Sequence, residues 1–337
     1  MRKLTLIFIL SLFISASIAQ TSDQFYEAGY TKMEAQNYSG AIEDFTRSIK
    51  LNPKNLDSYY NRATAKYYLN DLKGAIEDYG IAIQIDPTIA DLFYARGSVK
   101  QVAKDYQGAL KDFDMAIKLN PVESSYYINS GNVKNDLKDF DGALNNYSKG
   151  IEIDPYSWDL YFNRGHLKYM LRKYNEAIID LTKATELNKK SAEVFNALGN
   201  AKYALNDSKG AIDAFNKSIQ LDPTNENVYY NKGLARANDG ESENAIRDYT
   251  MAISIQPDFA NAFLNRGIAK AKLKKFQEAI LDFDQALKIK PDWTMVYFNR
   301  GLAKIFTGLE EQGCGDLKRA VQLGDKDAVK AIDQYCR

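Results

Sequence analysis

The sequence has little of the chemistry on which catalytic and metal sites usually depend. It contains one histidine, His166, and two cysteines, and it offers no Cys/His cluster with the spacing of zinc ligands. Its glycines are dispersed along the chain and are not gathered in a phosphate-binding loop. Carboxylates occur throughout and single out no acid–base pair. The sequence therefore predicts a protein that is not an enzyme and that binds no metal or cofactor.

An excess of charge of either sign is also missing. Lysine plus arginine and aspartate plus glutamate each total 44, and no basic run concentrates positive charge on one segment. A nucleic-acid binder normally carries a basic excess or a basic face, so we expect no nucleic-acid partner. Apolar residues make up 45% of the chain, which predicts a continuous folded core and argues against disorder.

Long apolar runs are absent after the N-terminus, where residues 1–19 have the pattern of a secretory signal peptide. Two basic residues precede an apolar run at 4–14, and small residues follow before an expected cut near Ala19/Gln20. The run is shorter than the roughly 20 residues of a membrane-spanning helix. We expect an exported protein, periplasmic or secreted, with no stable membrane span after cleavage. The alternative is an uncleaved signal anchor.

An internal repeat of 34 residues organises the rest of the chain. Every proline lies on one ladder with this step, apart from one double step: Pro53, Pro87, Pro121, Pro155, Pro223, Pro257 and Pro291. Ten residues after each proline position comes a small residue: Ala63, Gly97, Gly131, Gly165, Gly199, Gly233, Gly267 and Gly301. Twelve residues later comes alanine, followed after four more by an aromatic residue or leucine, as in Ala75 and Tyr79. Such a period predicts one supersecondary unit repeated along the chain.

Each repeat has the pattern of two helices. Proline cannot continue a helix, so a polar turn follows it and a first helix begins there. The small residue lies on this first helix, and the alanine and its aromatic partner lie on a second helix at helical spacing. Glycine inside a helix costs about 1 kcal/mol relative to alanine. Its recurrence therefore predicts a close approach between the two helices.

The small residue, the Ala-x-x-x-aromatic pattern and the proline at this period resemble the tetratricopeptide repeat (TPR). The resemblance covers residues 20–327 in nine units, near 22–55, 56–89, 90–123, 124–157, 158–191, 192–225, 226–259, 260–293 and 294–327. It implies an all-α fold, a right-handed α-solenoid whose first helices line the concave face. Single units cannot bury their apolar faces alone, so stability comes from stacking. An amphipathic segment at 325–337 is expected to cap the last unit.

One pair of positions departs from the family pattern. A cation stands just before the small residue, and an aspartate follows sixteen residues later: Arg62 with Asp78, Arg96 with Asp112, Arg164 with Asp180, Lys232 with Asp248, Arg266 with Asp282 and Arg300 with Asp316. Two units lack both residues, and one keeps only the acid, Asp44. This covariation predicts a salt bridge between the two helices of each unit, and the lysine found four residues after most of the cations is expected to be structural too. The alternative is a pair of solvated surface charges.

The resemblance also implies that a ligand lies along the first helices. Tyrosine offers a large contact area with a polar tip, and asparagine offers a donor and an acceptor, which suits an extended backbone. The candidate groove residues of this kind are Tyr26, Tyr60, Asn61, Tyr67, Tyr94, Phe162, Asn163, Tyr169, Tyr203, Tyr230, Asn231, Asn265 and Asn299. The alternative is that they pack between adjacent first helices, because aromatic residues at helical spacing are usually core.

The expected function is a protein-interaction scaffold or adaptor that holds a peptide or a partner protein. Some family members grip acidic peptides through groove lysines and arginines, whereas matching positions here carry acids such as Asp57 and Asp91. The partner is therefore expected to be neutral or basic. Two alternatives remain open: a chaperone-like holder of exported polypeptides, and a carbohydrate or cell-wall binding module.

The two cysteines, Cys314 and Cys336, lie together at the C-terminal end. In an oxidising compartment two cysteines suggest one bridge, which here would tie the capping helix to the last unit. The alternative is two buried free thiols.

Overall fold

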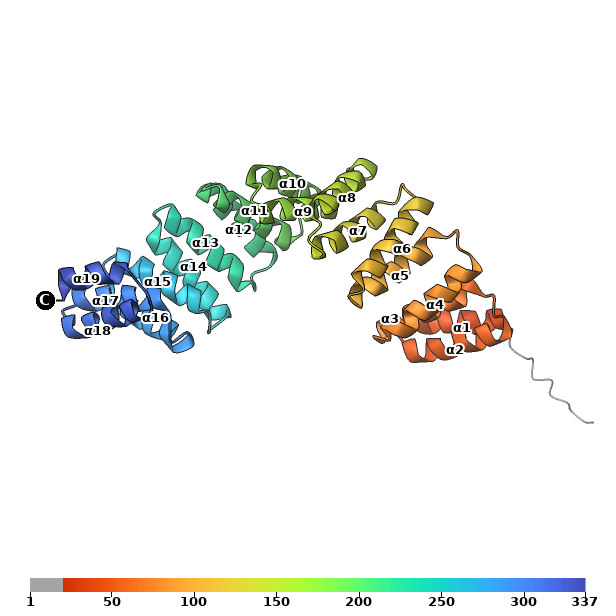
Figure 1. The fold of residues 1–337 in the computed structure, drawn as a ribbon, viewed down its shortest axis with the longest axis horizontal. Helices are drawn as coiled ribbons and strands as arrows, with labels where there is room; N and C mark the ends of the chain where they lie inside the picture. Colours follow the sequence, from red (N-terminus) through yellow and green to blue (C-terminus); the bar gives the residue numbers. More distant parts are fainter. Residues whose placement is uncertain (1–20, 337) are drawn as a thin grey trace, which may run out of the picture. The chain divides into compact units, whose positions relative to one another are not determined.

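The structure, a computed structural model, describes residues 21–336, and every regular element among them is an α-helix. The expected signal peptide and cleavage point lie outside these residues. Packing divides the chain into two compact units after Asp139. We call residues 21–139 the N-terminal module and residues 140–336 the C-terminal module, and each is an α-solenoid of stacked helix pairs (Figure 1).

The N-terminal module contains seven helices. They are α1 (Ser22–Glu34), α2 (Tyr38–Leu51), α3 (Leu56–Tyr68), α4 (Leu72–Ile85), α5 (Ala90–Val102), α6 (Tyr106–Leu119) and α7 (Ser124–Asp136). First helices have odd numbers and second helices have even numbers. Each helix packs mainly on the helices before and after it in the sequence.

The C-terminal module contains the remaining twelve described helices. They are α8 (Phe140–Ile153), α9 (Trp158–Met170), α10 (Tyr174–Leu187), α11 (Ala192–Ala204), α12 (Ser208–Leu221), α13 (Glu226–Asn238), α14 (Ser242–Ile255), α15 (Ala260–Lys272), α16 (Phe276–Ile289), α17 (Thr294–Phe306), α18 (Glu310–Gln322) and α19 (Asp327–Tyr335). The segment expected to cap the array corresponds to α19.

The turn between the two helices of a repeat contains a residue in the left-handed conformation, with φ between 57° and 82°. In the second repeat Asn70 adopts a left-handed conformation with φ 62°, and the Asp71 amide donates to the Lys66 carbonyl at 2.9 Å. This pattern satisfies carbonyls at the end of the first helix. The Asp71 side chain then accepts from the Gly74 amide at 2.9 Å and caps the second helix. Left-handed residues recur at the same place every 34 residues: Gln36, Asn70, Lys104, Lys138, Arg172, Asn206, Gly240, Lys274 and Gly308.

The recurrent glycine sits where the two helices of a repeat approach most closely. A Cβ atom on Gly199 would lie 2.5 Å from Cε1 of Phe215, a ring that is fully buried. Gly233 stands in the same relation to Tyr249, at 2.6 Å. No side chain fits in such a contact unless the ring moves. The position therefore requires a small residue, which is glycine in most repeats and Ala63 in the second.

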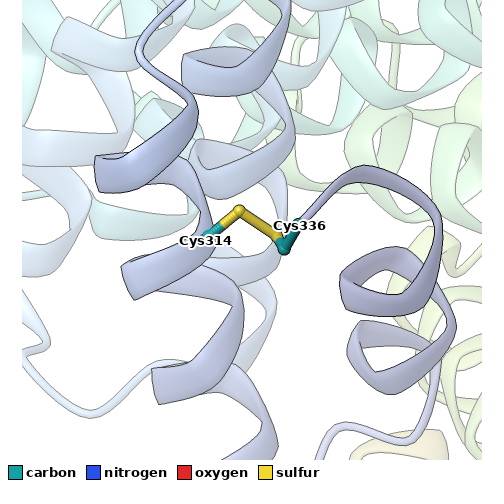
Figure 2. The surroundings of a disulfide bond; sticks show 2 residues. All are labelled: Cys314 and Cys336. Atoms are coloured by element: carbon teal, nitrogen blue, oxygen red, sulfur yellow. A yellow bond between two sulfur atoms is a disulfide. The ribbon is translucent and has the colours of Figure 1, made fainter.

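The C-terminal end is closed by α19 and a disulfide. Ala328 and Ala331 of α19 pack on Leu317 and Ala320 of α18. Cys314 on α18 and Cys336 just after α19 form a disulfide, with their Cα atoms 5.7 Å apart (Figure 2). Among residues 21–336, no helix is both long enough and apolar enough to cross a membrane.

Candidate functional site

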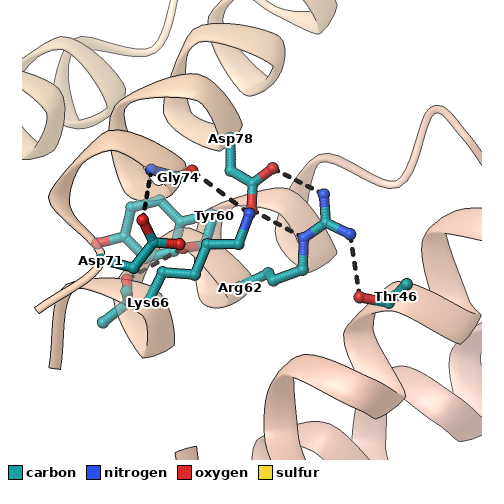
Figure 3. Close-up of polar contacts among 8 residues, drawn as sticks. Thr46, Tyr60, Arg62, Lys66, Asp71, Gly74 and Asp78 are labelled. Carbon is teal, nitrogen blue, oxygen red and sulfur yellow. Dashed lines mark hydrogen bonds and ion pairs between the residues drawn. The ribbon is translucent and has the colours of Figure 1, made fainter. Parts of the chain in front are cut away.

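The predicted cation–aspartate pairs form buried three-residue networks. In Figure 3 the Arg62 guanidinium donates from Nε and Nη2 to the two oxygens of Asp78, at 2.8 and 2.7 Å. Lys66 Nζ lies 2.7 Å from the same carboxylate, whose side chain is only 3% exposed. Equivalent networks are Arg96–Asp112–Lys100, Arg164–Asp180–Lys168, Lys232–Asp248–Arg236, Arg266–Asp282–Lys270 and Arg300–Asp316–Lys304.

The first repeat shows why its aspartate remains without the usual cation. Ala28 occupies the cation position there, but Lys32 Nζ lies 2.6 Å from Asp44 and takes its place. Lys32 is equivalent to Lys66, the second cation of the next repeat. Each of these seven buried aspartates therefore lies against at least one lysine or arginine.

The arginines also join neighbouring repeats. Arg62 Nη1 donates at 3.1 Å to Thr46, which lies on the second helix of the preceding repeat. Arg164 makes the same contact with Ser148 at 3.0 Å. The guanidinium of Arg62 also lies 5.5 Å from the centre of the Tyr59 ring. Arg62 on α3 thus links α2 and α4, and most of its N–H donors are already used within the protein, so few remain for a ligand.

Several predicted groove residues take part in hydrogen bonds between successive first helices. An asparagine Nδ2 donates to the tyrosine hydroxyl of the repeat before it: Asn61 to Tyr26 at 3.4 Å, Asn129 to Tyr94 at 2.9 Å and Asn265 to Tyr230 at 2.9 Å. Burial raises the pKa of the Tyr230 phenol, which keeps this hydroxyl neutral. These pairs are built into the stack, as the packing alternative anticipates.

The other predicted groove residues have more varied contacts. Ring contacts join Tyr60 to Tyr79 at 5.5 Å, Phe162 to His166 at 5.9 Å, Tyr169 to Tyr174 at 5.7 Å and Tyr67 to Tyr68 at 5.7 Å. Asparagine Nδ2 groups donate from Asn231 to Asn200 Oδ1 at 3.0 Å and from Asn299 to the Met295 carbonyl at 2.8 Å. Asn163 is half-buried on α9. The thirteen residues therefore do not gather at one place.

Two hollows in the C-terminal module bring some of them together. The larger, which we call the α11–α15 hollow, has a volume of about 340 Å³ and spans three successive first helices. Its lining residues are Tyr203, Leu234, Ala237, Asn238, Ser242, Tyr249, Asn265, Ile268, Ala269 and Lys272. Burial raises the pKa of Tyr249 well above its ordinary value, so its phenol stays neutral.

The smaller hollow, the α9/α11 pocket, has a volume of about 120 Å³. It lies between the first helices α9 and α11 and is lined by Phe162, His166, Tyr169, Glu193, Asn196, Ala197 and Asn200. Both hollows face the side of the stack formed by first helices, where sequence reasoning places the ligand. A wider hollow of about 550 Å³ lies beside Arg164 and Asp180, but those two groups already bond each other.

Sequence reasoning did not single out two lining residues, Asn238 and Ser242, whereas it placed Asn196 on the ligand-facing side of the first helices. The polarity of Asn196 is an exception within the repeat, because the equivalent residue in every other repeat is apolar or aromatic. Tyr249 was assigned to the core by its spacing, and it is both 1% exposed and part of the lining. In the part of the chain that the structure describes, no three His, Cys, Asp or Glu side chains cluster as a metal site would require.

Comparisons with known proteins agree with this architecture. Models described as "Tetratricopeptide repeat" match residues 26–88, 159–191, 226–259 and 260–292, and one described as "TPR repeat" matches 131–171 and 199–240. No curated protein sequence matches the chain.

Solved structures with the same fold include three that are informative. YrrB, "a TPR protein with an unusual peptide-binding site", is 25% identical with a TM-score of 0.51, over 55% of this chain and 95% of that one. The C-terminal part of a TPR repeat-containing protein from Cytophaga hutchinsonii is 17% identical with a TM-score of 0.61, over 71% and 98%. A tetratricopeptide repeat protein from Parabacteroides merdae is 20% identical with a TM-score of 0.53, over 74% and 98%. From its helix pairs, its period and these matches, the chain belongs to the tetratricopeptide repeat family.

Proposed function

We propose that this chain is a non-catalytic scaffold that holds an extended segment of a partner protein against the first helices of its C-terminal module. The α11–α15 hollow carries the proposal, since it spans three successive repeats and combines apolar walls with polar side chains. Its polar side chains form most of the accessible lining and can hydrogen-bond a peptide backbone, while its apolar side chains add contact area. The likeness to YrrB, a protein with a peptide-binding site by its own description, supports a peptide ligand.

The polar groups of the hollow are arranged to recognise a peptide backbone. Asn265 donates its Nδ2 to Tyr230, and Asn238 donates its Nδ2 to Ser208 at 3.0 Å. Each amide is thereby held in place, and its oxygen is the group left to accept a hydrogen bond. An extended peptide presents N–H groups to such acceptors, while Lys272 at the same hollow can donate to peptide carbonyls.

We also propose that the protein acts after export. Two features support this: the signal-peptide pattern of residues 1–19 and the bridge between Cys314 and Cys336. Disulfides form and persist in oxidising compartments and are rare in the cytosol. The partner would then be an exported or cell-surface polypeptide, of neutral or basic charge.

Selection from a library of random displayed peptides on the purified chain tests peptide binding. We expect extended peptides to be enriched. The Ala237→Phe variant, which fills the α11–α15 hollow, should weaken their binding by about tenfold or more, because the lost contacts exceed 1.4 kcal/mol. Met251→Phe is the matched control, since Met251 is an exposed residue on the second helix of the same repeat. Failure to enrich any peptide, or equal binding by Ala237→Phe, would contradict the proposal.

A further inference from the structure

The lining of the α9/α11 pocket contains hydrogen-bond acceptors and aromatic rings but no lysine or arginine. The Asn196 Oδ1 atom is buried and has no hydrogen-bond donor among the described residues. Glu193, three residues earlier on α11, contributes an exposed carboxylate to the same lining, which includes no lysine or arginine. A buried acceptor without a donor is costly, and such atoms are rare in native proteins.

Aromatic rings form the opposite wall. Phe162 and His166, one turn apart on α9, have ring centres 5.9 Å apart and planes inclined by 28°, and Tyr169 lies one turn further along. The faces of aromatic rings carry negative charge density and attract cations. The lining of the pocket thus combines an asparagine amide, a carboxylate and aromatic rings.

The repeat pattern shows that this polarity is specific to one repeat. The residues at the position of Asn196 in the other eight repeats are Tyr26, Tyr60, Tyr94, Ile128, Phe162, Tyr230, Leu264 and Phe298. All are larger or less polar. Asparagine at this place adds a polar amide to the lining between α9 and α11, whereas Leu264 shows that the fold accepts leucine at the equivalent position.

We propose that the α9/α11 pocket binds a cationic side chain, a lysine by size, of the segment held along the first helices. The ammonium group would donate to Asn196 Oδ1 and to the Glu193 carboxylate, with the rings of Phe162 and His166 beside it. A space of about 120 Å³ accommodates the end of a lysine side chain. This inference rests on the proposed function and adds to it a preference for a basic residue.

His166 is the only histidine of the chain, and its ring protons therefore report on the pocket directly in NMR spectra. The probe is N-acetyl-lysine-N′-methylamide, titrated into the purified full chain. We expect a saturable shift of the His166 signals with a Kd on the order of 1 mM, as befits so small a ligand. N-acetyl-norleucine-N′-methylamide has the four-carbon side chain of lysine without its ammonium group. We expect its affinity for the pocket to be less than a tenth of that of the lysine probe.

Two variants separate binding from folding. Asn196→Leu should abolish the lysine response without lowering the melting temperature, because it removes a buried acceptor that has no donor and copies the residue at position 264. A purely structural asparagine would instead be expected to lower it. Glu193→Gln should weaken lysine binding by about tenfold, whereas Glu243→Gln, the same change on an exposed part of α14, should have no effect.

The proposal is overturned if lysine leaves His166 unmoved, if norleucine binds as well, or if Asn196→Leu still responds. Any of these results leaves the peptide selection unaffected. Conversely, a chain that enriches no peptide yet binds the lysine probe would reject the scaffold proposal alone.

Discussion

Asp180→Ala is expected to lower the free energy of unfolding by about 3–5 kcal/mol. Asp180 is 2% exposed and lies 2.7 Å from Arg164 Nη2 and 2.9 Å from Lys168 Nζ. Without the carboxylate, two largely buried cations face each other with no buried anion between them. The desolvation cost of such sites is visible at Asp248, whose pKa is raised by burial even though two cations lie against it. Urea unfolding of the full chain, followed by circular dichroism, measures the loss.

The chain supplies its own control for this prediction. The next repeat has Leu198 and Ala214 at the positions of Arg164 and Asp180, so the double variant Arg164→Leu/Asp180→Ala copies a pair that the fold already contains. We expect the double variant to be more stable than the sum of the single losses predicts, by about 2 kcal/mol or more. Additive losses would mean that the two charges act independently.

Cys314→Ser is expected to destabilise the C-terminal end by about 3 kcal/mol, from the chain entropy of a loop closed by two cysteines with a sequence separation of 22. α19 has only nine residues, too few to persist as a helix unless it is packed. Its release would expose Leu317 and its neighbours on α18. Hydrogen exchange should therefore accelerate in α19 and in α18, and not in the helices of the N-terminal module. Unchanged exchange in α19 would show that packing alone holds it.

The intact mass of the protein, isolated from its cells without reductant, tests both the disulfide and the cleavage of the signal peptide. We expect a chain that begins near Gln20 and lacks two hydrogens, with no thiol that can be alkylated. Cys314→Ser provides the reference for a free Cys336. A chain that begins at Met1 would contradict cleavage of the signal peptide, and one with two alkylatable thiols would contradict the bridge.

The fold could be predicted almost completely from the sequence, because a period of 34 residues repeats the same information nine times. The same repetition acted as an internal alignment and indicated the Arg164–Asp180 pairing without any homologue. The second cation was harder to interpret, since spacing places Lys168 on the same face but does not reveal that its amine reaches Asp180. The division after Asp139 has no counterpart in the repeat pattern.

The sequence predicts which face of the stack would hold a ligand, namely the first helices, but not which residues on that face are available to it. Spacing assigns tyrosine and asparagine to the first helices, yet whether an amide faces a ligand depends on the distance to the next repeat. Asn265 bonds Tyr230, which its position in the sequence does not disclose. Asn196 could have been recognised as an exception, but the cavity beside it follows from how α9 and α11 pack, and that packing is a property of the folded stack.

A photo-crosslinking amino acid placed at Tyr203 and, separately, at Met251 in the cells that make the protein shows whether a partner binds to the first helices. Tyr203 lines the α11–α15 hollow on a first helix, and Met251 is exposed on a second helix of the same module. The account predicts that Tyr203 captures a defined partner polypeptide through an extended segment, and that Met251 does not. Capture from Met251 alone, or none from either position, would show that the first helices are not the surface that binds.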